Sequence, residues 1–161
     1  MSVLPPVFNE LFEKHGQCEI IDKLEKTLRN FDPNQTIGMG ACIILQDKYG
    51  HLVLVQQSIG PEHWFFVCGK NEDGESLEET TIREASEEIG CRVRVTGLHH
   101  IGHHYCVVKV VKHSLYYGAA LFAEIVSGVP NVYLEEISSV ATFRQLPENF
   151  LPGYKKYYQN I

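Results

Sequence analysis

Apolar and small residues recur at every fourth position between residues 77 and 89, which is the spacing of one face of an α-helix. Ser76, followed by Glu79, forms a capping-box pattern at the start of this repeat, and Gly90 follows its last member. The sequence therefore predicts a helix over residues 77–89 that docks one moderately apolar face on a sheet. The members of the repeat are Leu77, Thr81, Ala85 and Ile89.

Short runs of apolar and β-branched residues on both sides of this helix predict β-strands. Two runs precede the helix and are separated by a turn signal at residues 47–50. Two runs after the helix predict a hairpin that turns at residues 113–114. The predicted strands cover residues 36–45, 51–56, 92–97, 105–112, 115–126 and 138–143.

Residues 154–161 predict a second helix, which starts after Pro152 and Gly153. Strands on both sides of a central helix, with another helix after them, indicate an α/β (α+β) fold. We expect a mixed β-sheet between helices, that is, an α/β/α sandwich.

Residues 1–34 carry two apolar stripes and predict a helical extension ahead of one domain over residues 35–161. The extension either packs against the domain or provides a partner surface, such as that of a homodimer. The first stripe is Val7, Phe8, Leu11 and Phe12, and the second is Ile20, Ile21, Leu24, Leu28 and Phe31.

The composition is that of one globular domain: 161 residues, of which 44% are hydrophobic and 21% charged. A net charge of −6 argues against nucleic acid as a partner. We expect no membrane span and no signal peptide. The cysteines are scattered without a Cys-x-x-Cys pair, which predicts neither a disulfide framework nor a zinc site and favours a cytoplasmic location. They are Cys18, Cys42, Cys68, Cys91 and Cys106.

Three glutamates of the predicted helix, Glu84, Glu87 and Glu88, fall within one sector of about 100°. Like charges at this spacing repel each other by a few tenths of a kcal/mol per pair. The sector is either a solvated acidic face, which is common, or the binding face for a divalent cation. Mg²⁺ prefers carboxylate and phosphate oxygens, and the neighbouring Arg83 can orient one carboxylate.

Residues 69–91 resemble the Nudix box, Gly-x5-Glu-x7-Arg-Glu-U-x-Glu-Glu-x-Gly-U, in which U is apolar. Ala85 and Cys91 stand at the U positions, and the resemblance extends over about residues 36–154. The fixed positions are Gly69, Glu75, Arg83, Glu84, Glu87, Glu88 and Gly90.

The resemblance implies a Nudix pyrophosphohydrolase, in which water attacks a phosphorus of the diphosphate linkage in a nucleoside diphosphate derivative. It also implies Mg²⁺, with Mn²⁺ as a substitute, and an Arg83–Glu75 ion pair that fixes loop to helix. The expected metal ligands are Glu84, Glu87, Glu88 and the carbonyl group of Gly69. The expected catalytic residues are Arg83 and a general base among Glu84, Glu87 and Glu136, the last because the family often supplies a late loop glutamate.

Three residues outside the carboxylate set are candidates for substrate binding. Lys70 either contacts a phosphate or is a solvated loop lysine. Trp64 and Tyr105 either stack on a base or pack in the core. The histidines at residues 99–104 either bind a metal or mark a strand end or loop near the pocket, and Cys68 is interpreted as a small buried residue.

Three functions remain open on this fold. The first is a hydrolase of a nucleoside triphosphate, a nucleotide sugar or a dinucleotide. The second is a non-catalytic nucleotide-binding regulatory module, although such modules usually lose carboxylates that this chain keeps. The third is an isoprenyl diphosphate isomerase, whose cysteine and histidine pattern is not found in the sequence.

Overall fold

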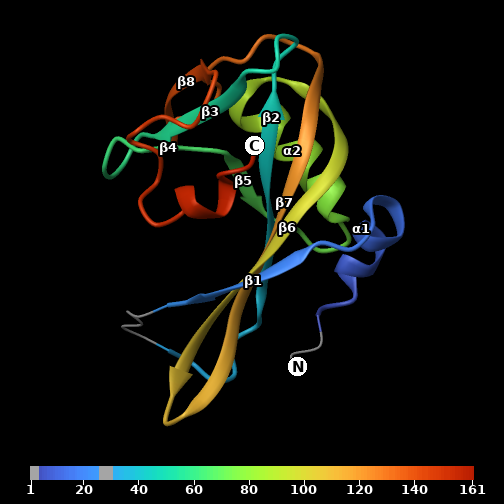
Figure 1. The fold of residues 1–161 in the computed structure, drawn as a ribbon, viewed down its shortest axis with the longest axis vertical. Helices are drawn as coiled ribbons and strands as arrows, with labels where there is room; N and C mark the ends of the chain where they lie inside the picture. The colour runs from blue at the N-terminus through green and yellow to red at the C-terminus, as the bar shows by residue number, and fades with distance from the viewer. Residues whose placement is uncertain (1–3, 26–30) are drawn as a thin grey trace.

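The computed structural model describes residues 4–25 and 31–161, in which eight strands form one mixed sheet (Figure 1). The strand order is β1-β6-β7-β2-β3-β4, with β5 paired to β2 and β8 paired to β3. The pairs β1/β6 and β2/β7 are parallel and the others are antiparallel, so the predicted mixed sheet is confirmed. The strands are β1 (Glu19–Leu24), β2 (Gly38–Gln46), β3 (Leu52–Gln57), β4 (Trp64–Phe65), β5 (Val67–Lys70), β6 (Arg92–Val108), β7 (Val111–Ser127) and β8 (Ile137–Phe143).

The central helix, α2 (Leu77–Ile89), begins and ends where the sequence predicts. Ser76 and Glu79 form the capping box, and Gly90 ends the helix in the left-handed conformation with φ 67°. Ala85 and Ile89 are fully buried against β2 and β3 in one core cluster. The short loop between β5 and α2 therefore holds the start of the helix at one edge of the sheet.

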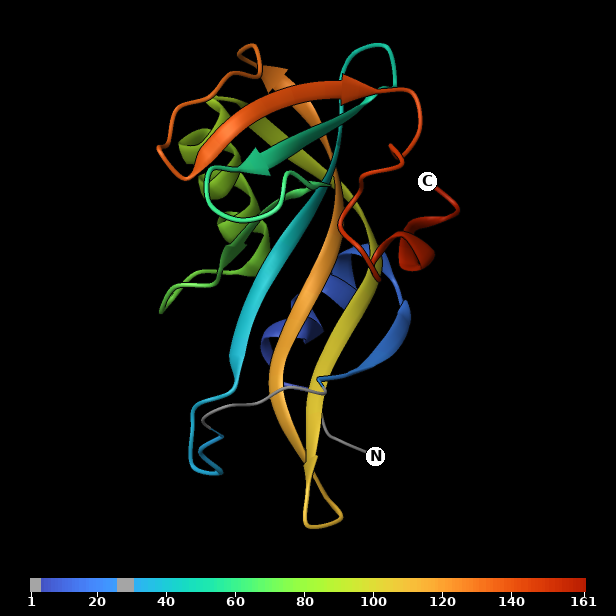
Figure 2. The ribbon, with the colours of Figure 1, turned by 90° about the vertical axis from the view of Figure 1, so that its left-hand side faces the viewer.

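The two faces of the sheet carry different covers, as Figure 2 shows. Helices α1 (Val7–His15) and α2 lie on one face, and the C-terminal segment lies on the other. The predicted terminal α-helix is wrong, because only a 3₁₀ helix, η1 (Lys155–Tyr158), forms there. A segment this short is a marginal helix in itself. Packing of aromatic side chains such as Phe65 against Tyr158 holds it on the sheet instead.

The N-terminal extension is not helical throughout, which corrects the sequence prediction. Its first stripe lies on α1, where Phe8 and Leu11 are buried, but residues 19–24 form strand β1. This strand pairs in parallel with the middle of β6, from Glu19 opposite His100 to Leu24 opposite Tyr105. The open edge of β6 supplies hydrogen-bond partners that a reading of periodicity does not include. The predicted stripe member Leu28 lies outside the described residues.

The long hairpin of β6 and β7 turns at Lys109 and Val110, not at the predicted residues 113–114. Both turn residues have positive φ, 48° and 64°, as a two-residue hairpin turn of the primed type requires. The sequence lacks the Asn-Gly signal for such a turn, and His113 and Ser114 are strand residues.

A disulfide joins Cys42 of β2 to Cys68 of β5, so the prediction that the cysteines form no disulfide is wrong, and Cys68 is a bridged, half-buried residue. The two residues are directly opposite each other in the antiparallel β2/β5 pair. Strand pairing brings them together across 26 positions of sequence, which no local spacing rule detects. In the described part of the chain, no helix is long and apolar enough to cross a membrane.

Candidate active site

Arg83 of α2 connects three carboxylates and the loop before the helix. Its Nε and Nη2 donate to the two Glu75 oxygens at 2.7 and 3.1 Å, and Nη2 also donates to the Lys70 carbonyl at 2.9 Å. Nη1 donates to Glu84 at 2.7 Å and to Glu87 at 3.1 Å. Arg83 thus ties the loop to the helix and orients two of the acidic side chains.

Glu75 is the most strongly held carboxylate of the loop. Hydrogen bonds from Arg83 lower its pKa to about 2, with further donation from the Glu72 backbone and Thr80. Asn71 closes the same loop by donating to the Glu75 carbonyl at 3.0 Å and to Thr80 at 2.9 Å. The end of β5, which carries the Gly69 and Lys70 carbonyls, is therefore tied to α2 through Arg83, and Asn71 closes the loop that follows it.

Gly69 and Glu84 lie against each other where β5 meets the start of the loop. A Cβ atom at position 69 would overlap the Glu84 carboxylate, so only glycine allows this approach. Burial raises the pKa of Glu84, although Arg83 opposes the shift. The Glu84 side chain is thereby held against the β5 backbone at Gly69.

Glu88 lies one helical turn beyond Glu84 and is the most deeply placed of the three helix glutamates. Burial raises its pKa to about 8, and the charges of Glu84, Glu136 and Glu87 add to the shift. Its Oε2 atom is buried and accepts no hydrogen bond from any described residue. Glu88 is therefore a buried oxygen donor without a partner, surrounded by other carboxylates.

A cavity of about 220 Å³ opens beside Glu88. Across it lies His63, whose Nδ1 is the other buried side-chain atom that lacks a hydrogen-bond partner within the described ranges. His63 was not among the residues predicted from the sequence, because a histidine in a Gly-Pro loop belongs to no recognisable motif. Other lining residues include Gln57, Phe65, Cys68, Ile137 and Leu151.

The predicted substrate residues do not gather at this cavity. Trp64 is half-buried and packs edge-on against Phe143, with 4.9 Å between the two ring centroids. Tyr105 is on β6, and the Lys112 Nζ atom lies 4.0 Å from the centroid of its ring. Tyr105 does not line the Glu88 cavity. Lys70 is exposed on β5. Glu136 is exposed beside the start of β8, and its negative charge contributes to the raised pKa of Glu88.

The histidines of residues 99–104 lie in the interior of β6, not at a strand end or in a loop. His103 Nδ1 pairs with Asp22 and His104 Nδ1 with Glu25, each at 2.7 Å, so both histidines join β6 to the N-terminal segment. Burial lowers the pKa of His100 to about 3, which keeps this imidazole neutral. Two of the four therefore serve strand pairing.

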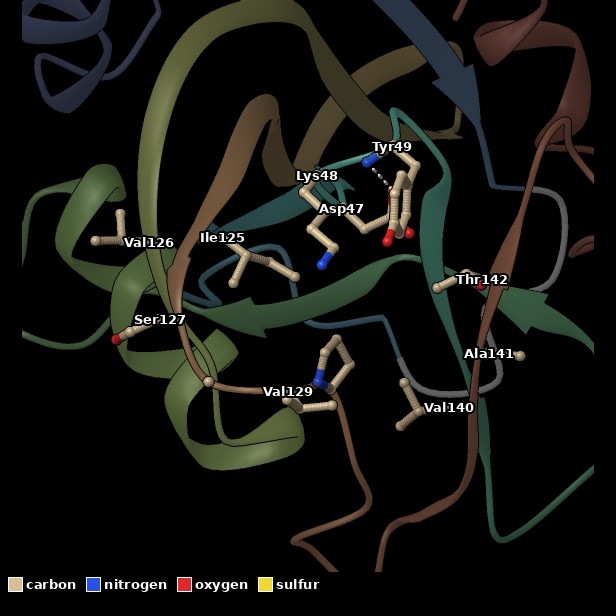
Figure 3. A pocket seen from close by; sticks show the side chains of 12 residues that line it. Asp47, Lys48, Tyr49, Ile125, Val126, Ser127, Val129, Val140, Ala141 and Thr142 are labelled. Atoms are coloured by element: carbon tan, nitrogen blue, oxygen red, sulfur yellow. Dashed lines mark hydrogen bonds between the residues drawn. The ribbon is translucent and has the colours of Figure 1, made fainter.

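The largest of the cavities found, about 650 Å³, lies elsewhere (Figure 3). It is bounded by the β2–β3 turn at Asp47 to Tyr49, by the end of β7 and by β8. None of the helix glutamates lines it. Of these glutamates, Glu88 lines the cavity of about 220 Å³, whereas Glu84 and Glu87 do not.

Within residues 4–25 and 31–161, no three His, Cys, Asp or Glu side chains are grouped so that they could hold a metal ion as they stand. The Glu84 and Glu87 carboxylates are instead paired with Arg83. The donor chemistry nevertheless fits a hard cation. Carboxylate oxygens, one carbonyl and the unpartnered Glu88 Oε2 are oxygen donors of the kind that Mg²⁺ takes.

A mixed sheet and an acidic helix that follows β5 define an α+β domain with a group of carboxylates on one helix face. A family model described as NUDIX domain matches residues 36–161. The chain belongs to the Nudix family.

Solved structures share this fold at low sequence identity. A MutT NUDIX hydrolase from Burkholderia pseudomallei is 20% identical with a TM-score of 0.60, covering 79% of this chain and 99% of that one. An ADP-ribose pyrophosphatase from Streptococcus suis is 14% identical with a TM-score of 0.56, covering 77% and 87%. A UDP-X diphosphatase is 19% identical with a TM-score of 0.54, covering 78% and 64%.

Proposed function

We propose that this member of the Nudix family is a hydrolase that cleaves the diphosphate linkage of a nucleoside diphosphate derivative by attack of water at phosphorus, and that it depends on a divalent cation. The observation that carries the proposal is the buried Glu88 Oε2, which has no partner among the described residues and faces a cavity. Leaving a carboxylate oxygen buried and unpaired is costly. A bound cation would remove that cost.

Mg²⁺, or Mn²⁺ in its place, would be held by Glu84, Glu87, Glu88 and the Gly69 carbonyl. When bound, it would neutralise charge on the phosphate oxygens and lower the pKa of a bound water. The site would then accept an anionic substrate in spite of the net charge of −6.

The remaining side chains position the reacting groups. Arg83 donates a hydrogen bond to one oxygen of Glu84 and one of Glu87. The other oxygen of each carboxylate would bind the cation while Arg83 keeps the carboxylate in place. Glu75 holds Arg83 from the loop side. A water activated by Glu84, Glu87 or Glu136 would attack the phosphorus, and Lys70 would contact a phosphate from β5.

Substitution of single carboxylates tests this proposal. Glu87→Gln and Glu88→Gln should each lower kcat/KM at least tenfold at saturating Mg²⁺. EDTA should abolish turnover of every substrate in a panel of nucleoside triphosphates, nucleotide sugars and dinucleotides. Retention of activity within a few-fold in both variants would contradict the metal assignment.

Glu78→Gln is the matched control. Glu78 is on the same helix but pairs with His15 at 2.7 Å and Lys14 at 3.1 Å on α1, so this variant should keep its kcat/KM. Binding of nucleotides without turnover in the wild-type protein would favour the regulatory alternative. A homodimer and a cytoplasmic location stay predictions of the sequence.

A further inference from the structure

Another cavity, of about 160 Å³, lies on the sheet face opposite α2 and is called the second cavity below. Phe65, Cys68 and Leu151 line both this cavity and the one beside Glu88, so the two adjoin. Its far wall includes Lys23, which belongs to β1 and precedes the matched Nudix domain. The residues of this cavity that matter below are Lys23, His100, His104, Tyr116 and Tyr154.

Tyr116 connects the second cavity to the loop of the acidic site. Its ring lies on glycines, since a Cβ atom at Gly38 would be 2.8 Å from the ring and one at Gly118 would be 3.1 Å from it. Its hydroxyl and the Gly69 carbonyl would both meet a Cβ atom at Gly40. Tyr116 therefore stands between the Gly69 carbonyl and the second cavity, of which Lys23 forms part of the wall.

Lys23 is a half-buried ammonium group with no ion pair or hydrogen bond to the described residues. Its Nζ lies over the rings of Tyr154 and Tyr157, at 4.8 and 4.5 Å from their centroids. It also lies over the floor of the sheet, 3.0 Å from where a Cβ of Gly102 would be. Burial lowers its pKa to about 8, and Glu25 opposes this shift.

We propose that the second cavity is a subsite for the end of the substrate remote from the diphosphate, and that Lys23 selects an anionic group there, a phosphate or a carboxylate. Negative charge on the ligand would offset the cost of holding this cation away from water. His100 is neutral and the tyrosines carry no charge, so Lys23 is the charged donor of the cavity. The subsite rests on the proposed hydrolase function for its substrate, but its binding preference is measured independently.

Two pairs of ligands that differ by a single anionic group test the subsite. NADP differs from NAD by one phosphate, and UDP-glucuronate differs from UDP-glucose by one carboxylate. Titration calorimetry with Ca²⁺ in place of Mg²⁺ keeps a divalent cation at the site and measures affinity, and product analysis of the same samples checks that no turnover occurs. The wild-type protein should bind the charged member of at least one pair about tenfold more tightly. The pair that shows the preference identifies phosphate or carboxylate.

Lys23→Met keeps the aliphatic stem and should reduce this preference to less than twofold, while affinity for the uncharged member stays within twofold. Lys112→Met is the control, because Lys112 pairs with Asp22 and does not line the cavity. Equal affinities within both pairs, or a preference that survives in Lys23→Met, would overturn the subsite. Absence of hydrolysis alongside the preference would contradict only the proposed function.

Raising the pH gives a second measurement, which needs no variant and applies if Lys23→Met does not fold. Deprotonation of Lys23 should weaken the preference between about pH 7 and about pH 9.5. A preference that is unchanged over this range would overturn the proposal. The titratable groups that face Lys23 or act on it are Glu25 directly after β1, His100 and His104 of β6, Tyr116 of β7, and Tyr154, Lys156 and Tyr157 of the C-terminal segment.

Discussion

Among features of single residues, the close approach of Gly69 to Glu84 matters most to the acidic site. Gly69→Ala should lower kcat/KM at least tenfold, because the added methyl group displaces the Glu84 carboxylate. Thermal unfolding should change little, since the overlap is with a side chain at the edge of the sheet. Gly97→Ala is the control, because its Cβ would lie 3.5 Å from Phe122 in ordinary contact. Equal activity of the two variants would contradict this account of Gly69.

The Glu75–Arg83 pair predicts how stability depends on pH. The folded-state pKa of Glu75 is lowered from 4.5 to about 2, so the pair stabilises the protein above about pH 4.5 and loses its contribution as the pH falls toward 2. After allowance for solvent screening, this contribution is about 1–2 kcal/mol.

Glu75→Gln should therefore unfold more easily than the wild-type protein at pH 7, and the difference should shrink below pH 4. Chemical denaturation at a series of pH values measures it. A difference in unfolding free energy that grows as the pH falls would contradict the assigned sign.

For the helices and strands, the main feature that the sequence did not predict is how the strands pair. The bounds of α2 follow from Ser76, Glu79 and Gly90, which are local signals. The strand at residues 19–24 and the turn at Lys109 depend on partners far along the chain. Local periodicity records which face of a segment is apolar, but not which neighbour supplies its backbone hydrogen bonds.

The Cys42–Cys68 disulfide between β2 and β5 should stabilise the fold measurably. Closing a loop with a sequence separation of 26 contributes about 3 kcal/mol in the chain-entropy description. Dithiothreitol should therefore lower the unfolding temperature of the wild-type protein, whereas Cys42→Ser should unfold at one temperature with and without it.

A thiol count in denaturant checks the same bond directly. The free cysteines are Cys18, Cys91 and Cys106, so only these should react before reduction. Reaction of all five cysteines without a reductant would contradict the disulfide.

At the scale of the whole molecule, the box motif predicted the acidic helix and its loop but not the shape of the cavities. The motif fixes charges at one helix face, and Arg83 and Glu75 meet there. His63, Tyr116 and Lys23 come from three other parts of the chain. Their positions depend on the sheet order, which brings β1 beside β6 and β7 beside β2.

We expect the carboxylates of α2, above all Glu88, to bind a divalent cation. Titration of Mn²⁺ followed by electron paramagnetic resonance measures this binding without substrate. The account predicts saturable binding in the wild-type protein, affinity at least tenfold weaker in Glu88→Gln, and wild-type affinity in Glu78→Gln. Equal Mn²⁺ affinity in the wild-type protein and Glu88→Gln would contradict it.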